Sequence, residues 1–365
     1  MTPADCGENH KKSSDQRVVM LEVPEAWFDD PSDGNLHQRL YASILSALAE
    51  LDVVIRPVWL PRGADLAPRD TRGYDLVLSY HSYGTADSRL LRCKESYIPP
   101  YYTMDDMGYA CFSRLSCHPD EFSSEIARQD PAVAATYVRH LAERLRRENC
   151  SKYSQPPFGE NTLQGYVFVP LQVQSDPVSQ KVPLQISRAL EAIVSAASAR
   201  GLRTIIKRHP RCKSATMTKL LQQLEKKPDV DISTASVHAL MANAECVVGA
   251  NSGVLFEALI QGKPVISYGA SEFARITQAV TSYEDLFDAV SAPQPIDPEH
   301  REKFIYWYLE KHCVKAGDVL GIKAKIEKSL KHSSSRNAYN QTGNTIYKLQ
   351  LRFHSLKSKI KRRIF

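Results

Sequence analysis

An alternation of short apolar runs with helix-length segments in the second half of the chain constrains its fold most. The run "YVFVPLQ" (166–172) is followed by a helical pattern at 182–200 and by the strand-like "RTIIK" (203–207). The pattern continues with helices at 215–226, 236–243 and 252–261, and with the strand-like runs "VDIS", "ECVVGA" and "PVISYG". Strands that alternate with helices in this way predict a parallel sheet with right-handed crossovers.

The first half of the chain shows the same style and ends in a linker. The run "RVVMLEVP" (17–24) predicts a buried strand, and apolar residues spaced four apart between Leu36 and Leu51 predict a helix. "DVVIRPVWLP" and "YDLVLSYHS" predict further strands, and "SQPPFGENTLQG" is rich in turn residues. A length of 365 residues suits two cores of ordinary size. We therefore predict an α/β fold with two doubly wound, Rossmann-like domains (17–150 and 160–330) that face a cleft, and a separate segment at 340–365.

Composition and missing motifs disfavour several classes of protein. No apolar run approaches the roughly 18 residues of a membrane-spanning helix, and the beginning of the chain is too polar for a signal peptide. The eight cysteines are scattered, with no C-x-x-C pair and no paired histidines spaced for zinc. The absence of G-x-G-x-x-G, G-x-x-x-x-G-K-[ST] and G-x-S-x-G disfavours dinucleotide enzymes, P-loop NTPases and serine hydrolases. We expect a cytoplasmic location, no metal and no cofactor.

Positive charge is concentrated in residues 346–365. They carry +7 with no acidic residue, whereas the whole chain carries +6, so the rest of the chain has a charge of −1. Apolar residues recur there every three or four positions and predict an amphipathic helix with one apolar stripe, formed by Ile346, Leu349, Phe353, Leu356, Ile360 and Ile364. Such a helix suits an anionic membrane surface. Docking on the protein's own core is the first alternative, and nucleic-acid binding, which we do not expect, is the second.

Ligands of doubly wound sheets bind outside the carboxyl ends of the strands, and three loops there carry polar residues. These loops are "QVQSDP" (172–177), "KRHPR" (207–211) and "ANSG" (250–253). In the second loop, strand alternation places Lys207 and His209 on one side, and Pro210 ends the strand. An imidazole and a nearby ammonium can donate hydrogen bonds to a phosphate. The alternative to a phosphate site is an exposed basic turn that only connects the strand to the next helix.

The other two loops add a helix start and a carboxylate. Asn251 or Ser252 can cap the next helix, whose first N–H groups attract an anion, and Gly253 permits close approach. Glu257 on the same helix could reach ribose hydroxyls, unless it is only an exposed surface acid. Asp176 can act as a base or a nucleophile, or can serve only as a turn former. Together the three loops indicate group transfer from a nucleotide.

Three stretches resemble the capsule polysaccharide biosynthesis family of bacterial glycosyltransferases, which includes the Kdo transferases. They are "VFVPLQVQSDPVSQ", "IIKRHPR" and "VVGANSGVLFEALIQGKPVISYG", and the resemblance covers about residues 165–270. It implies a GT-B fold, with the acceptor on the N-terminal domain and a nucleotide sugar on the C-terminal one. The His-Pro pair is also similar to that of bacterial sialyltransferases and implies a CMP-activated donor such as CMP-Kdo.

The resemblance also implies roles for the loop residues. The donor pocket would contain His209 at the phosphate or cytidine of CMP, Asn251 and Ser252 at the phosphate, and Gln172. Asp176 would be the catalytic carboxylate, acting either as a base with inversion or as a nucleophile with retention, and related Kdo transferases favour retention. His209, Lys207 and the helix start would stabilise the departing CMP without a metal.

The stretch 97–116 is a candidate wall for the acceptor. Its aromatic and acidic residues could stack on a sugar and hydrogen-bond to it, and packing and turn formation explain them equally well. These residues are Tyr101, Tyr102, Asp105, Asp106 and Tyr109.

The predicted function is transfer of Kdo or a related sugar from a CMP-activated donor to a glycolipid or polysaccharide acceptor. This reaction would belong to bacterial capsule or surface polysaccharide biosynthesis and would take place at the inner face of the cell membrane. A GT-B transferase that uses a UDP- or GDP-sugar and a non-catalytic polysaccharide-assembly module are the alternatives.

Overall fold

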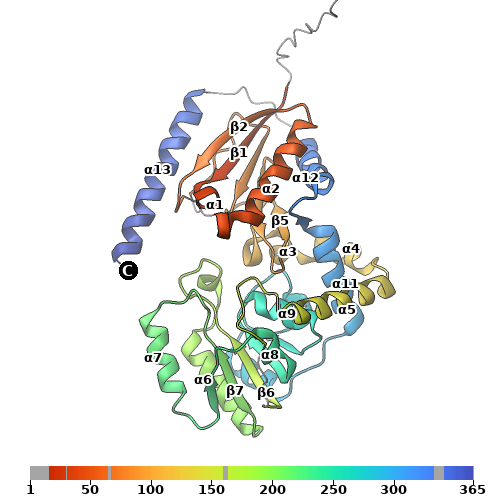
Figure 1. The fold of residues 1–365 in the computed structure, drawn as a ribbon, viewed down its shortest axis with the longest axis vertical. Coiled ribbons are helices and arrows are strands. Elements are labelled where there is room, and N and C mark those ends of the chain that lie inside the picture. Colours follow the sequence, from red (N-terminus) through yellow and green to blue (C-terminus); the bar gives the residue numbers. More distant parts are fainter. Residues whose placement is uncertain (1–15, 30, 65–66, 159–162, 333–340, 365) are drawn as a thin grey trace, which may run out of the picture. The chain divides into compact units, whose positions relative to one another are not determined.

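The chain divides into two compact units, which Figure 1 shows as a ribbon. The computed structural model describes residues 16–29, 31–64, 67–158, 163–332 and 341–364. Unit 1 contains the chain up to Cys93 and again from Ala316, and unit 2 contains Lys94 to Lys315. This division differs from the predicted boundary near residue 150, because buried side chains between residues 98 and 145 share a hydrophobic core with the second sheet.

Unit 1 is built on a parallel sheet. Its elements are β1 (Val18–Pro24), α1 (Glu25–Asp29), α2 (Pro31–Ala49), β2 (Val54–Leu60), β3 (Leu76–Tyr80), the part of β4 (Leu90–Glu95) up to Cys93, α12 (Val319–His332) and α13 (Gln341–Ile364). The strands pair in parallel in the order β4-β3-β1-β2. β1 is buried along most of its length, as expected for a strand inside a parallel sheet. The predicted helix between Leu36 and Leu51 is confirmed as α2, which buries Leu40, Ile44 and Leu48.

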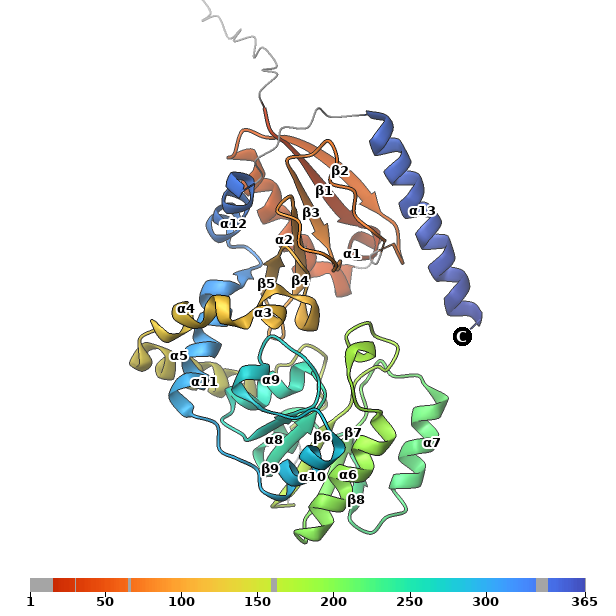
Figure 2. The ribbon, with the colours of Figure 1, turned by 180° about the vertical axis from the view of Figure 1, so that it is seen from behind.

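The last helix of the chain, α13, packs on the sheet of unit 1. Tyr347 and Leu351 join a buried cluster that includes Met20 of β1 and Val58 of β2. Figures 1 and 2 show α13 alongside β2 from two opposite sides. The predicted helix in this segment is confirmed. Within the described parts of the chain, no helix combines the length and the apolar character needed to cross a bilayer.

Unit 2 contains a second parallel sheet and many short helices. Before the sheet come β5 (Tyr101–Asp105), η1 (Ala110–Phe112), α3 (Arg114–Cys117), η2 (Pro119–Phe122), α4 (Ser123–Ala127) and α5 (Pro131–Arg147). The sheet region holds β6 (Tyr166–Pro170), η3 (Ser179–Lys181), α6 (Ile186–Ala199), β7 (Arg203–Lys207), α7 (Ala215–Leu224), β8 (Val230–Ile232), α8 (Val237–Ala242), β9 (Ala244–Gly249), α9 (Gly253–Ile260) and β10 (Val265–Ser267). After it come η4 (Ala274–Ile276), β11 (Gln278–Ala279), α10 (Tyr283–Ser291), α11 (Pro298–Trp307), η5 (Tyr308–His312) and β12 (Val314–Lys315).

The strand order of unit 2 reverses at β6. The order is β11-β10-β9-β6-β7-β8, and the described pairings are parallel. The chain runs outward from β6 through β7 to β8 and then returns to the other side of β6 as β9. In doubly wound sheets, ligands bind outside the carboxyl ends of the two strands at such a reversal, here β6 and β9.

Alternate residues of β6 face opposite cores. Tyr166 and Phe168 join a cluster with residues of α5, α8, α9 and α11, whereas Val167 and Val169 join a cluster with residues of α6, α7 and α10. The predicted strands and helices from residue 166 to residue 268 are confirmed. The only large shift is at α6, which begins at Ile186 rather than at residue 182.

Candidate functional site

The loops after β6 and β9 are joined by two reciprocal hydrogen bonds at the switch point. Gln172 Nε2 donates to Asn251 Oδ1 (2.6 Å), and the Asn251 backbone N–H donates to Gln172 Oε1 (3.1 Å). Asn251 Nδ2 also donates to the carbonyl oxygen of Ala270 (3.0 Å), in the loop after β10. Because Asn251 is 4% exposed, its amide serves to hold three loops in register. The structure therefore brings Gln172 and Asn251 together, as the resemblance implied.

A small pocket lies beside Gln172 at the carboxyl ends of β6 and β9. It is lined by Pro170, Leu171, Gln172, Gln174, Ser179, Val182, Leu184, Ile186, Ala250 and Tyr268. A larger and more open groove runs between α6 and α10, where the Arg188 guanidinium lies 4.2 Å from the centre of the Tyr283 ring. That groove is on the helical flank of unit 2. The position of the small pocket at the strand ends fits ligand binding better.

His209 is held by its own loop and by an aromatic ring. Its Nδ1 accepts a hydrogen bond from the backbone N–H of Arg211 (3.1 Å), and the Tyr153 ring meets it edge-on with centroids 4.9 Å apart. Burial, and then the positive charge of Arg211, lower the pKa of His209 below its usual 6.5. The ring is therefore neutral at pH 7 and, since Nδ1 accepts, carries its proton on Nε2. His209 can thus donate a hydrogen bond from Nε2 to an anion.

Tyr153 is a component of the site that the sequence analysis missed. The Arg211 guanidinium lies 5.0 Å from the centre of its ring, so Tyr153 contacts both basic residues that flank Pro210. Its neighbour Lys152 pairs with Glu95 (3.3 Å) and contributes to the lowered pKa of His209. No pattern marks Tyr153, because its contacts join segments far apart in the chain.

Asp176 is exposed and shapes the loop after β6. Its Oδ1 accepts a hydrogen bond from the backbone N–H of Val178 (2.9 Å), and its own N–H donates to the carbonyl oxygen of Val173 (3.1 Å). Asp176 therefore does form a turn, which is one of the roles that the sequence predicts for it. The negative charge of Asp176 also opposes the fall in the pKa of His209, so the two side chains lie within electrostatic reach.

The first two basic residues of the loop after β7 hold neighbouring segments. Lys207 Nζ donates to the carbonyl oxygens of Ala235 (2.5 Å) and Thr234 (3.0 Å), and burial lowers its pKa. Arg208 Nη1 donates to Thr218 Oγ1 (2.9 Å) of α7. The ammonium group of Lys207 therefore adds positive charge near the loop, while its N–H groups are hydrogen-bonded to the carbonyl oxygens of Thr234 and Ala235, which follow β8. Pro210 is exposed at the turn.

Ser252 caps α9. Its Oγ accepts a hydrogen bond from the backbone N–H of Val254 (3.3 Å), so the predicted cap is Ser252 rather than Asn251. A Cβ added at Gly253 would meet only the Tyr97 ring, at 3.6 Å, which is an ordinary contact. The protein itself therefore does not require glycine there. The positive end of the α9 dipole begins beside Asn251.

Glu257 lies inside unit 2 rather than on its surface. It is 1% exposed, and its Oε1 accepts a hydrogen bond from Ser151 Oγ (2.7 Å). Its Oε2 is 3.7 Å from His238 Nε2, which bonds to the carbonyl oxygen of Cys150 (2.7 Å). Burial raises the pKa of Glu257 to about 8. The interpretation of Glu257 as an exposed helix acid is wrong.

The candidate acceptor wall is occupied by packing and turn contacts. Tyr101 and Tyr102 are buried in β5. The Asp105 carboxylate accepts hydrogen bonds from the backbone N–H groups of Met107, Gly108 and Arg114 (2.7, 2.8 and 3.0 Å), and burial raises its pKa. Asp106 forms a two-pronged ion pair with Arg114, and Tyr109 is 5% exposed. The alternative of packing and turn formation accounts for these residues.

The assembled loops suit an anion. His209 supplies a neutral N–H donor, Lys207 and Arg211 supply positive charge, and α9 presents its N-terminal end. Among the residues that the structure describes, no three His, Cys, Asp or Glu side chains gather as a metal site would require.

Residues 122–298 match the model of a family described as capsule polysaccharide biosynthesis protein. The resemblance predicted from the sequence is confirmed. The matched residues include all three candidate loops. A search of curated proteins by sequence gives no match.

The chain is also similar to several solved structures. The chain is similar to KpsC, beta Kdo 2,4 transferase, of Thermosulfurimonas dismutans, with a TM-score of 0.51 and 13% identity over 86% of this chain and 98% of that one. KpsC, beta Kdo 2,7 transferase, of the same organism gives a TM-score of 0.48 and 15% identity over 85% and 99%. A UDP-GlcNAc 2-epimerase of Methanocaldococcus jannaschii gives 0.33 and 11% over 80% and 98%. The first of these similarities, with the two mostly parallel sheets, confirms the predicted α/β, GT-B-like fold.

Proposed function

We propose that this chain is a glycosyltransferase that transfers Kdo or a related sugar from a CMP-activated donor to a glycolipid or polysaccharide acceptor, in capsule or surface polysaccharide biosynthesis. One observation carries the proposal. Gln172, Asp176, His209 and Asn251 come from three loops that follow the carboxyl ends of β6, β7 and β9 in one parallel sheet, where Gln172 and Asn251 hydrogen-bond to each other. The family match and the fold support glycosyl transfer. The His-Pro loop supports a CMP-sugar as donor.

In this proposal the donor phosphate lies between His209 and the start of α9. The Nε2–H group of His209 donates to a phosphate oxygen, and the N-terminal end of α9, capped by Ser252, adds partial positive charge. Lys207 contributes its charge through space. As the bond from the sugar to CMP breaks, negative charge grows on the departing CMP, and these groups stabilise it. We propose no metal and no cofactor.

Asp176 is the proposed catalytic carboxylate. As a nucleophile, one oxygen of Asp176 attacks the anomeric carbon while CMP leaves, and the acceptor hydroxyl then displaces the carboxylate, with net retention. As a base, the carboxylate removes the proton of the acceptor hydroxyl, which attacks directly with inversion. Both roles require an accessible carboxylate, and Asp176 is exposed. Resemblance to the Kdo transferases favours retention.

The proposed place of action is the inner face of the cell membrane. A glycolipid or growing polysaccharide acceptor would be met there, by a cytoplasmic protein that binds the membrane peripherally. The segment proposed to contact the anionic surface is 346–365, which carries +7.

A thermal-shift titration with CMP, UDP and GDP tests the donor site. It is run on the wild type, on His209→Ala and on His118→Ala, which removes the histidine of a second His-Pro pair that follows no strand of the second sheet. A nucleotide at 100 times its Kd adds roughly 2.7 kcal/mol to the stability of the folded protein. We expect CMP to stabilise the wild type and His118→Ala but not His209→Ala.

Two other outcomes would contradict the proposal. Stabilisation by UDP or GDP but not by CMP would assign a different donor class. No response to any nucleotide would favour a non-catalytic assembly module.

A further inference from the structure

Helix α13 is attached to unit 1 by one face. Tyr347, Leu351 and Ser355 follow one another at four-residue spacing and are 2%, 1% and 4% exposed. Leu351 packs in the cluster that contains Met20 and Val58, and Ser355 Oγ donates to the carbonyl oxygen of Arg62 (2.6 Å). Side chains four apart lie on one face of a helix. One row of side chains therefore docks α13 on the sheet.

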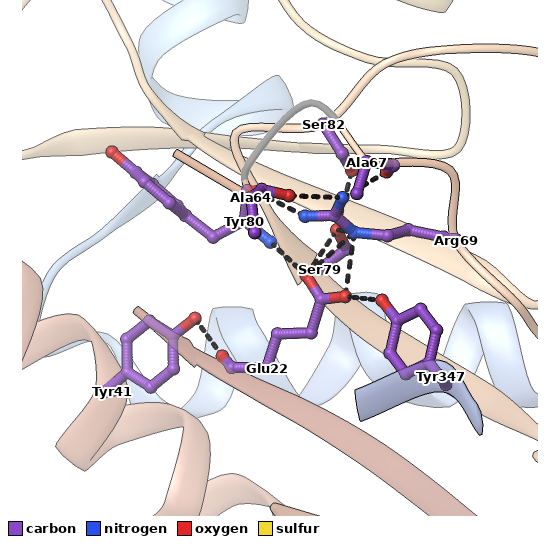
Figure 3. Close-up of polar contacts among 9 residues, drawn as sticks. All are labelled: Glu22, Tyr41, Ala64, Ala67, Arg69, Ser79, Tyr80, Ser82 and Tyr347. Carbon is purple, nitrogen blue, oxygen red and sulfur yellow. Dashed lines mark hydrogen bonds and ion pairs between the residues drawn. The ribbon is translucent and has the colours of Figure 1, made fainter. Parts of the chain in front are cut away.

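One of these attachments, through Tyr347, ends at a buried ion pair. Figure 3 shows the Tyr347 hydroxyl donating to the carboxylate of Glu22, which also pairs with Arg69 Nε (2.8 Å). Glu22 is fully buried, and Ser79 Oγ donates to the same carboxylate (2.9 Å). Removing α13 would leave this buried carboxylate without one of its donors, which is costly. Release of the helix from the sheet is therefore disfavoured.

The opposite face of α13 exposes a row of large apolar side chains. Ile346, Leu349, Phe353 and Leu356 are 52%, 60%, 66% and 58% exposed. At 3.6 residues per turn, the centre of this row lies about 180° around the helix from the centre of the docked row. The predicted apolar stripe therefore lies on a helix, as expected, but it is exposed. The residues that pack on the sheet, Tyr347, Leu351 and Ser355, are not part of the stripe. Membrane binding and docking, which the sequence presents as alternatives, are compatible in the structure.

The charges beside the row have one sign. Lys348, Arg352 and Lys357 are exposed, and residues 346–365 contain no acidic side chain. The apolar row is flanked by Arg352 on one side and Lys357 on the other when the helix is viewed along its axis. The stripe residues Ile360 and Ile364 and four further basic residues lie outside the described side chains. An exposed apolar row bordered by cations is complementary to a lipid surface that carries negative charge.

We propose that α13 binds an anionic membrane through Ile346, Leu349, Phe353 and Leu356 while its opposite face stays packed on the sheet of unit 1. The helix lies in the plane of the interface, with its apolar row among the acyl chains and its cations at the lipid phosphates. The Tyr347–Glu22 contact then holds unit 1 at the surface. This inference deepens the membrane contact of the proposed function and is independent of the donor.

Vesicle co-sedimentation of the full chain, without nucleotide, tests the outward face. Vesicles contain phosphatidylcholine alone or phosphatidylcholine with phosphatidylglycerol. The variant Leu349→Ser with Phe353→Ser should bind the anionic vesicles at least roughly tenfold more weakly than the wild type. Each of Lys348→Gln, Arg352→Gln and Lys357→Gln should weaken binding about fivefold, on the anionic vesicles only. The control Leu320→Ser, which changes an exposed leucine of α12, should bind like the wild type.

Three results would overturn the proposal. One is equal vesicle binding by the wild type and the Leu349→Ser, Phe353→Ser variant. Another is concentration-dependent dimerisation of the wild type that this variant abolishes, since the row would then contact a second copy. The third is loss of hydrogen-exchange protection in β2 on vesicles, which would show that α13 leaves the sheet. Because none of these measurements uses the donor, their failure would leave the proposed glycosyl transfer unaffected.

Discussion

Glu22 and Asp176 both lie toward the carboxyl end of a parallel strand, Glu22 within the last residues of β1 and Asp176 in the loop that follows β6. Glu22 is fully buried and is met by Arg69, Ser79 and Tyr347. Asp176 is exposed and accepts a backbone hydrogen bond from Val178. The position at a strand end is therefore insufficient to define a site. Because Glu22 is buried and surrounded by hydrogen-bond donors, its role is structural. Asp176 is exposed, so its carboxylate is accessible to a ligand.

The comparison predicts its largest effect at Glu22. Glu22→Gln removes one charge of a buried pair and leaves the Arg69 guanidinium uncompensated, at a cost of about 3–5 kcal/mol. The urea midpoint of unfolding should fall accordingly. Replacing both partners by apolar residues, as Glu22→Leu with Arg69→Met, should restore only part of the loss, because the unpaired charge is then absent but the Tyr347 hydroxyl still lacks its acceptor. A change below about 1 kcal/mol in the single variant would contradict the structural role of Glu22.

A third carboxylate, Glu257, extends the comparison because its basic neighbour is His238, whose pKa is lowered by burial, rather than an arginine. Its pKa is about 8 in the folded protein and near 4.5 in the unfolded chain. Between these values the folded protein keeps a proton that the unfolded chain has lost, so this group makes stability fall as pH rises. The fall is at most roughly 1.4 kcal/mol per pH unit. It should disappear in Glu257→Gln, whose amide oxygen can still accept from Ser151.

Denaturation of the wild type and Glu257→Gln at about pH 5.5 and about pH 7.5 measures this contribution. We expect Glu257→Gln to gain stability relative to the wild type at the higher pH. Parallel pH profiles for the two proteins would show that Glu257 is ionised in the folded state.

The smallest effect on stability is expected at Asp176. Asp176→Asn should change the free energy of unfolding by no more than about 0.5 kcal/mol, since an asparagine oxygen can accept the Val178 N–H. Sugar transfer should nevertheless fall by roughly 10²-fold or more. The matched control is Asp297→Asn, because Asp297 is also exposed and accepts from an N–H two residues further on, that of Glu299 (3.2 Å). A transfer rate unchanged in Asp176→Asn would remove Asp176 from the site.

Local patterns explain which elements the sequence predicted correctly. The strands and helices from residue 166 to residue 268 follow from the length of each apolar run and from helix periodicity, and these signals depend on neighbouring residues. The assignment of residues 94–150 to unit 2 depends on long-range packing, such as Val138 and Leu141 of α5 in one cluster with Phe256 of α9. Periodicity along α5 reveals an apolar face but not its partner.

Part of the candidate site was also predictable. A strand end followed by His209 or Asn251 is visible in the sequence, and topology alone brings these loops to one edge. The contacts of Tyr153 and the attachment of Lys207 to the carbonyl of Ala235 join distant segments and leave no pattern. On α13, Tyr347 docks because its hydroxyl meets Glu22, whereas the more apolar Phe353 stays outside. Hydropathy ranks these two residues in the opposite order.

The most direct test of the central claim compares CMP with cytidine by calorimetric titration of the wild type and His209→Ala. A hydrogen bond to a charged phosphate is worth about 1.5–3 kcal/mol, or roughly 10- to 100-fold in Kd. We predict that the wild type prefers CMP to cytidine by at least this factor, and that the preference falls by about this factor in His209→Ala while its affinity for cytidine is unchanged. An equal preference for CMP in both proteins would contradict the account, because the phosphate would then be bound away from His209.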